Sequence, residues 1–164
     1  METPIANQKN IMQTEGLQYV GFWARVGATL IDTLLLGILI WPVLTKLYGQ
    51  GYWLSDELIQ GPADLLFGWI LPAVVVILLW VKKQATPGKM LISARIVDAE
   101  SGQKPSLGQY IKRYLGYYLA IMPLGLGIVW VAFDPRKQGW HDKLASTVVI
   151  RPKEPRPVVF NESP

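Results

Sequence analysis

The chain has 164 residues, a net charge of +4 and no cysteine. Its length suits a single domain, and the lack of cysteine excludes disulfides, thiolate catalysis and cysteine-type zinc sites. Hydrophobic residues make up 51% of the chain and charged residues only 17%, which is more apolar than a typical soluble domain. Because the apolar residues gather in three blocks, the composition predicts an all-α integral membrane protein, a small multi-spanning helical bundle.

Residues 1–18 are polar and lack the apolar core of a signal peptide, so we predict an N-terminal tail. The first apolar block, residues 22–47, is long enough to cross a bilayer as a helix, which needs about 20 residues. It carries Arg25 and Asp32, two charges that a membrane helix normally excludes. The position of Asp32 in the block predicts a depth of roughly 15 Å, near the midplane of the bilayer.

Two roles are open for Asp32. A buried carboxyl would favour its protonated form, which suits a proton carrier. Alternatively, Asp32 is a structural clamp that accepts hydrogen bonds from another helix or pairs with Arg25 or Arg113. Thr29 lies between the two charges of the first block and is a supporting candidate. Arg25 either extends to the lipid headgroups or pairs with Asp142 at the cytoplasmic mouth.

The second apolar block, residues 65–81, ends in Lys82 and Lys83, whereas the preceding loop (49–64) is acidic and has no Lys or Arg. Cytoplasmic loops are enriched in Lys and Arg. This pattern predicts a cytoplasmic N-terminus and an external acidic loop. It also predicts a multi-pass protein of a bacterial inner membrane.

The segment 82–113 is strongly basic. Residues 90–99 resemble a short strand, which we expect to pair with residues 146–150 on the cytoplasmic side. Ser106 is a candidate N-cap for a following helix. The Thr86–Lys89 stretch lacks the glycine spacing of a phosphate loop, and we interpret it as a turn with Lys89 at the lipid surface.

The third apolar block, residues 114–133, is interrupted by Pro123, Gly125 and Gly127. It is either one span or a broken helical hairpin that begins near Leu107 and has two legs of unequal length. The basic segment that follows favours the hairpin, because a hairpin returns that segment to the cytoplasm. Residues 152–164 are rich in proline and charge and are expected to form a flexible tail.

Three stretches together resemble the RDD family of bacterial membrane proteins. They are GFWARVGATLIDTLLL, TPGKMLISARIVDAESGQKPSLGQYIKRYLGYYL and RKQGWHDKLASTVVIRP, and the similar region covers residues 19–151. The arginine and two aspartates that name the family correspond to Arg25, Asp32 and Asp142. The resemblance implies a membrane domain without an assigned activity. Transport of an unidentified ligand has been suggested for the family, and some members have been linked to cation/proton antiport.

The remaining candidate residues are His141, Asp142, Lys89 and Arg113. We expect Asp142 to anchor the C-terminal segment against Arg25, Lys89 or Arg113. His141 is the only histidine of the chain, so a multi-histidine metal site is excluded and a pH-sensing role is open. The sequence has no nucleophile–base pair or metal-ligand cluster, so it predicts neither an enzyme nor a cofactor.

Two functional hypotheses follow. The first is a transporter of a small solute or ion, proton-coupled through Asp32, which would need oligomers because a few short helices cannot enclose a path. The second is a non-transporting membrane partner or assembly factor, in which the Arg and Asp positions lock the fold. The expected partners are the lipid bilayer, a second copy or another membrane protein, and for transport a small ligand or cation. Nucleic acid is not expected, because the basic residues flank apolar blocks.

Overall fold

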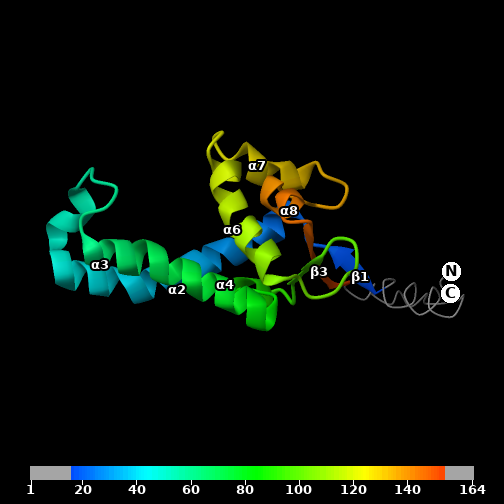
Figure 1. Ribbon diagram of the computed structural model, residues 1–164, viewed down its shortest axis with the longest axis horizontal. Coiled ribbons are helices and arrows are strands. Elements are labelled where there is room, and N and C mark those ends of the chain that lie inside the picture. Colours follow the sequence, from blue (N-terminus) through cyan, green and yellow to red (C-terminus); the bar gives the residue numbers. More distant parts are fainter. Residues whose placement is uncertain (1–15, 154–164) are drawn as a thin grey trace, which may run out of the picture.

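The computed structural model of the protein describes residues 16–153. It consists of a long helical hairpin and a smaller body at one end of it, which we call the cap (Figure 1). The predicted tails lie almost wholly outside the described residues.

The hairpin pairs two antiparallel stretches of helix. The first is α2 (Phe22–Tyr48), which continues through Pro42 without a break. The return stretch begins at α3 (Pro62–Asp64), passes through a π-helical segment, η2 (Leu65–Ile70), and ends in α4 (Leu71–Lys83). A short 3-10 helix, η1 (Gln50–Leu54), lies in the connecting loop.

Both stretches are long and apolar enough to cross a membrane, as predicted. Only 6% and 11% of the residues in their most apolar windows are buried. The hairpin therefore projects from the cap with apolar side chains on its surface.

The cap contains the remaining helices and a small sheet. Its elements are α5 (Pro87–Leu91), β2 (Arg95–Asp98), α6 (Leu107–Ile121), α7 (Leu126–Val129), η3 (Trp130–Ala132), α8 (Trp140–Leu144), β3 (Thr147–Pro152) and, from before the hairpin, β1 (Leu17–Tyr19). The sheet has the order β1-β3-β2, and both pairs are antiparallel. The predicted pairing of the two later strands is confirmed, with Val97 opposite Val148. The third strand, β1, includes Leu17 and Gln18, which were expected to belong to the tail.

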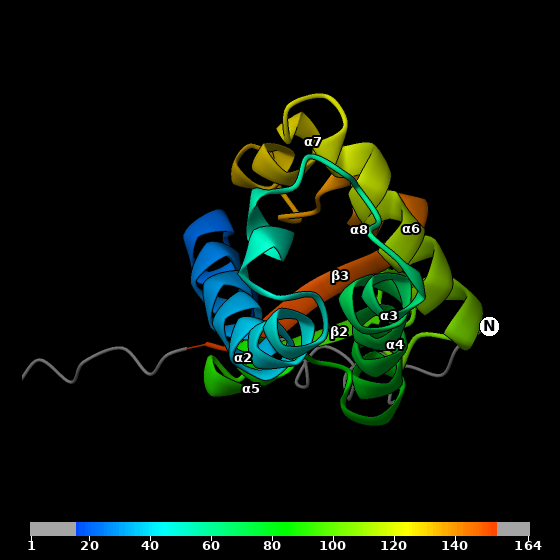
Figure 2. The ribbon, with the colours of Figure 1, turned by 90° about the vertical axis from the view of Figure 1, so that its left-hand side faces the viewer.

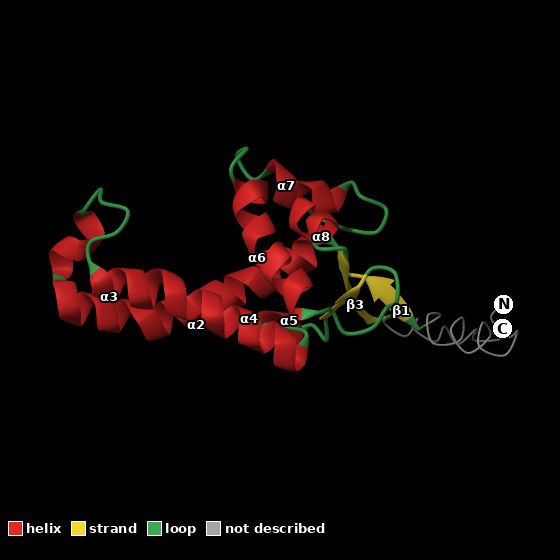
Figure 3. Ribbon diagram, viewed as in Figure 1, coloured by secondary structure: helices red, strands yellow, loops and turns green. Residues whose placement is uncertain are grey.

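The sheet joins three segments that the apolar blocks separate in the sequence. β1 precedes the first block, β2 follows the second, and β3 follows the third. All three strands lie together at the end of the hairpin opposite its loop (Figure 3). Both ends of the described chain are therefore on the same side of the hairpin.

The third apolar block is broken, as the favoured hypothesis expected. α6 begins at a capping box in which Ser106 and Gln109 each satisfy the other's backbone N–H. The chain then turns at Leu124 and Gly125, both with positive φ, so that Leu107–Ile121 and Leu126–Ala132 differ in direction by 115°. The two legs are unequal, and α6 runs transverse to the hairpin from its contact with α4 instead of alongside it (Figures 1 and 2).

The hairpin and the cap share one hydrophobic core. Trp80, near the end of α4, is only 2% exposed, and its ring lies 6.0 Å from that of Tyr110 and 6.3 Å from that of Tyr117 on α6. Ile96 of β2 and Val149 of β3 complete the core from the sheet. This packing places α6 at the level of the last turn of α4.

Candidate functional site

Asp142 lies at the centre of a buried cluster that joins three helices. Its Oδ2 accepts a hydrogen bond from Arg25 Nη1 at 2.6 Å, and its Oδ1 accepts one from Arg113 Nη1. The backbone N–H of Gly139 donates to Oδ2 at 3.0 Å. The Asp142 and Arg113 side chains are fully buried. This cluster holds α2, α6 and α8 together.

Arg25 makes two further bonds that fix the start of α2. Its Nε donates to the carbonyl of Val20 at 3.0 Å and its Nη2 donates to the carbonyl of Lys137 at 2.6 Å. The residue is only 9% exposed. Arg25 therefore does not extend to a lipid surface, and it pairs with Asp142 and not with Asp32.

Arg113 points inward from α6. Its Nη1 also donates to Thr147 Oγ1 at 2.8 Å. Its guanidinium carbon lies 5.5 Å from the ring centre of Trp80 and 5.9 Å from that of Tyr117, which is within the range of cation–π attraction. The only arginine of α6 is thus covered by aromatic rings and bound to a carboxylate.

The cluster carries an excess of positive charge. Burial raises the pKa of Asp142, but Arg113, Arg25 and the Gly139 N–H outweigh it and hold this pKa well below its usual range. The Asp142 carboxylate therefore faces two guanidinium groups. Lys89 is a further nearby cation, and its charge lowers the pKa of His141.

His141 is packed beside this cluster as a neutral side chain. Its ring stacks on Tyr117 with centroids 3.9 Å apart, and a Cβ at Gly116 would lie 2.8 Å from His141 Cα. Burial lowers the pKa of His141 to about 3; Asp142 opposes this shift, whereas Arg113 and Arg25 add to it. The imidazole thus stays uncharged at neutral pH.

We expect the stability of the cap to fall as the pH drops below about 6.5, the ordinary pKa of histidine. Below that pH the unfolded chain binds a proton at His141, whereas the folded chain does not bind it until about pH 3. The free energy of unfolding should fall by up to ~1.4 kcal/mol per pH unit in this window. Denaturant unfolding in mild detergent between pH 7.5 and 4.5 measures the slope. His141→Gln should flatten it, and equal slopes in the two proteins would contradict the buried neutral histidine.

Asp32 belongs to a second, separate cluster. Its Oδ2 accepts a hydrogen bond from Thr86 Oγ1 at 2.5 Å, and its Oδ1 accepts one from the Gly88 N–H at 2.7 Å. Among residues 16–153, no Lys or Arg nitrogen pairs with it. Asp32 thus accepts hydrogen bonds from the first turn of another helix, α5, where a carboxylate also complements the helix dipole.

The structure places Asp32 beside residues that follow α4, and its depth in a bilayer stays a prediction. Thr86 and Gly88 come after the end of α4 at Lys83, and both donate hydrogen bonds to Asp32. The reason is that α5 folds back against α2. Gly88 makes this possible, because a Cβ there would lie 2.8 Å from the backbone carbon of Ala28 and closer still to its oxygen.

The prediction that Lys89 lies at the lipid surface was wrong. Lys89 is only 5% exposed, and its Nζ lies 3.4 Å from Thr86 Oγ1. The cause is α5 itself, whose docking on α2 turns Lys89 inward. Thr29, the remaining candidate, is exposed on α2.

Thr86 and Gly88 are site residues that sequence reasoning missed. The signal was present, since a threonine followed by proline is typical of a helix start, and Pro87 is the first residue of α5. Asp64 was also missed as a site residue. It is 3% exposed at the loop end of the hairpin, where it accepts hydrogen bonds from Tyr52 Oη at 2.6 Å and the Gln60 N–H at 2.9 Å.

Within residues 16–153, no group of three or more His, Asp or Glu side chains is placed to hold a metal ion. Two clefts are lined by cap residues, and neither lining includes Asp32 or Asp142. Both aspartates join helices: Asp142 joins α8 to α2 and α6, and Asp32 joins α2 to α5.

Comparison with known proteins gives a family and no activity. The model of the RDD family matches residues 19–146. The uncharacterized protein YxaI of Bacillus subtilis is 28% identical over 146 residues, covering 79% of this chain and 95% of its own length. The uncharacterized membrane protein YteJ of the same organism is 28% identical, covering 82% of each chain. The uncharacterized protein RP437 of Rickettsia prowazekii is 40% identical over 72 residues, which cover 44% of this chain and only 39% of that protein. No solved structure matches.

Proposed function

The chain belongs to the RDD family, and we propose that it is a two-span membrane protein that works by assembling with other transmembrane helices. In this proposal Arg25, Asp32 and Asp142 lock the cap onto the hairpin and do not carry a solute. The observation that supports it most strongly is that both carboxylates are bound within the chain, Asp142 by two arginines and Asp32 by α5.

The dimensions of the hairpin support two crossings. From Asp32 to Tyr48, α2 rises about 24 Å, somewhat less than the ~30 Å of a hydrocarbon core. One end of this length carries the Asp32 cluster. At the other end, Asp64 donates its backbone N–H to the hydroxyl of Tyr48. In this proposal Asp32 and Asp64 each lie near a membrane boundary, where desolvation of a carboxylate costs less than at the centre of the bilayer.

The apolar surface of the hairpin supports assembly with other helices more than it supports transport of a solute. Large apolar side chains such as Leu34, Ile38 and Trp41 are well exposed on α2. Two antiparallel helices cannot enclose a polar path, so any path would need helices from another chain. Lys82 and Lys83 at the end of α4 support a cytoplasmic cap in a bacterial inner membrane.

Reconstitution into liposomes tests this proposal. We expect the wild-type protein to carry no proton or cation flux above that of empty liposomes under a pH or sodium gradient. Ile38→Cys, on the exposed side of α2, should cross-link to a second copy or to another membrane protein in native membranes. Glu100→Cys, on an exposed turn of the cap, is the matched control and should not. Failure of both positions to cross-link would contradict assembly through the hairpin.

Transport remains a second candidate, and one observation favours it. Asp32 makes no ion pair with any residue from 16 to 153, whereas Asp142 makes two with arginines, so no cation of the described chain would compete with a transported cation for the Asp32 carboxylate.

Asp32→Asn separates the two candidates. The amide keeps an oxygen acceptor for Thr86 or Gly88, so in the assembly proposal it costs ~1–2 kcal/mol of stability and changes no flux. A wild-type flux that disappears in a correctly folded Asp32→Asn protein would establish transport and overturn the first proposal.

A further inference from the structure

The outward face of α6 has the wrong polarity for a helix in water. Six exposed apolar residues of α6 and its C-cap form one stripe, at positions spaced by three or four along the chain: Leu107, Ile111, Leu115, Tyr118, Leu119 and Met122. Ile121, Gly108 and Lys112 are also exposed on this helix. Its buried face instead holds Arg113 and Tyr110. A surface helix of a soluble protein shows the opposite distribution. The stripe therefore faces an apolar medium.

The position of α6 identifies that medium. The helix packs on Trp80, one turn before the basic end of α4 at Lys82 and Lys83. Its axis is transverse to that of the hairpin, so α6 runs roughly parallel to the plane of any bilayer that the hairpin spans. It also lies nearer the hairpin loop than α8 and the sheet do (Figures 1 and 2). Its level is thus that of the interface between hydrocarbon and headgroups.

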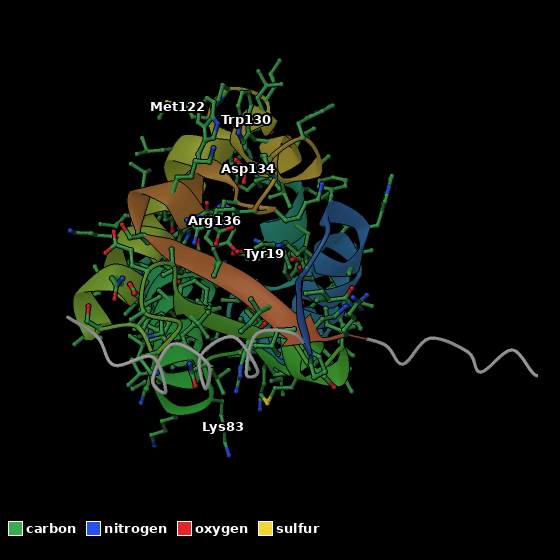
Figure 4. The ribbon with its side chains drawn as sticks, turned by 90° about the vertical axis from the view of Figure 1, so that its right-hand side faces the viewer. Tyr19, Lys83, Met122, Trp130, Asp134 and Arg136 are labelled. Carbon is green, nitrogen blue, oxygen red and sulfur yellow. The ribbon has the colours of Figure 1, made fainter. Side chains whose placement is uncertain are left out.

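The apolar surface continues beyond α6. Met122 is 77% exposed and Leu124, in the following turn, is 98% exposed. An open cleft of about 780 Å³ extends between the end of α6 and α8 and is lined by Leu119, Met122, Pro123, Trp140, Lys143 and Leu144. Viewed from the sheet side, Met122 lies at the edge of the cap opposite Lys83 (Figure 4). The apolar surface of α6 and of the turn after it therefore extends away from the hairpin, to the far edge of the cap.

We propose that α6 is an in-plane interfacial helix, whose apolar stripe is buried in the bilayer leaflet on the side of the cap. Lipid acyl chains cover the stripe and occupy the cleft between α6 and α8. Lys112, exposed next to the stripe, directs its ammonium group to the headgroups. The cap thereby binds one leaflet from the side while the hairpin crosses both, a division typical of interfacial helices combined with a span. This inference rests on the proposed crossing of the bilayer by the hairpin.

Single spin labels in proteoliposomes test this arrangement. Because the chain has no cysteine, each introduced cysteine carries the only label. Leu115→Cys and Met122→Cys report the stripe, Val74→Cys on an exposed position of α4 reports the hairpin, and Glu100→Cys reports the water-exposed turn. Molecular oxygen partitions into the bilayer, whereas a nickel chelate stays in water, so the ratio of their collision rates reports the surroundings of each label.

We expect the oxygen-to-nickel ratio at Leu115 and Met122 to be several-fold higher than at Glu100 and to approach that at Val74. A ratio equal to that at Glu100 would overturn the proposal, since the stripe would then face water. Low collision rates with both reagents at Leu115 and Met122 would also overturn it, because a protein would then cover the stripe. A water-like value at Val74 itself would instead refute the membrane crossing.

Discussion

Asp142→Asn should destabilise the cap by about 3–5 kcal/mol, the usual cost of removing one partner from a buried ion pair. The amide cannot neutralise Arg25 and Arg113, and the guanidinium of Arg113 is fully buried. Thermal unfolding in detergent and the yield of monodisperse protein measure the effect. We expect most of the variant to be lost during purification.

Asp134→Asn is the matched control, in the same C-terminal segment. Asp134 pairs with Lys143 at 2.5 Å, and its own side chain is only 7% exposed, but the lysine side chain is 45% exposed. The asparagine oxygen can still accept hydrogen bonds from the N–H groups of Arg136 and Gln138, so losing the pair should cost only about 1 kcal/mol. Adding Arg113→Met to Asp142→Asn should recover part of the loss, because it removes a buried charge that has lost its partner. Equal losses for Asp142→Asn and Asp134→Asn would show that the cluster does not hold the helices together.

Gly88→Ala should separate α5 from α2, at a cost of about 3 kcal/mol from steric overlap and lost hydrogen bonds. The added Cβ would meet the backbone of Ala28. Moving α5 away to relieve this contact would also break the hydrogen bonds that Thr86 and Gly88 donate to Asp32. The thermal unfolding midpoint should fall, and protease sensitivity around α5 should rise.

Gly27→Ala is the control for the same chemical change. Gly27 is a helical residue of α2, and nothing lies within 4 Å of the methyl group that alanine would add, so alanine should be neutral or stabilising by up to ~1 kcal/mol. Ala28→Gly should not rescue Gly88→Ala, because the overlap is with the Ala28 backbone and not with its side chain. Rescue by Ala28→Gly, or tolerance of Gly88→Ala, would contradict the close contact between α5 and α2.

Local features of the fold could be predicted from the sequence. Both apolar helices, the strand segments of β2 and β3, the helix start at Ser106 and the break in the third block depend on patterns within about 20 neighbouring residues. Hydrophobic periodicity and capping act over this range. The pairing of Arg25 with Asp142 was one of several expected options for each residue, and sequence alone did not choose among them.

The tertiary contacts decided the rest. Arg25 and Asp142 are 117 positions apart, and their contact exists because β1 and β3 bring the two ends of the chain together. Asp32 and Arg25 were candidates for pairing because they share a helix face. Each instead has a partner from another element, since a helix brought alongside offers a closer hydrogen-bond partner than a residue two turns away.

By itself the sequence determined that this protein has two apolar helices, a basic connecting segment and a broken third block, because those properties are written in local composition. Only the tertiary structure decided that Lys89 is buried, that Asp32 bonds to α5 and that α6 lies transverse to the hairpin. The physical reason is that burial and hydrogen-bond partners depend on which distant surfaces meet, and a local pattern of apolar residues is compatible with either protein or lipid as its neighbour.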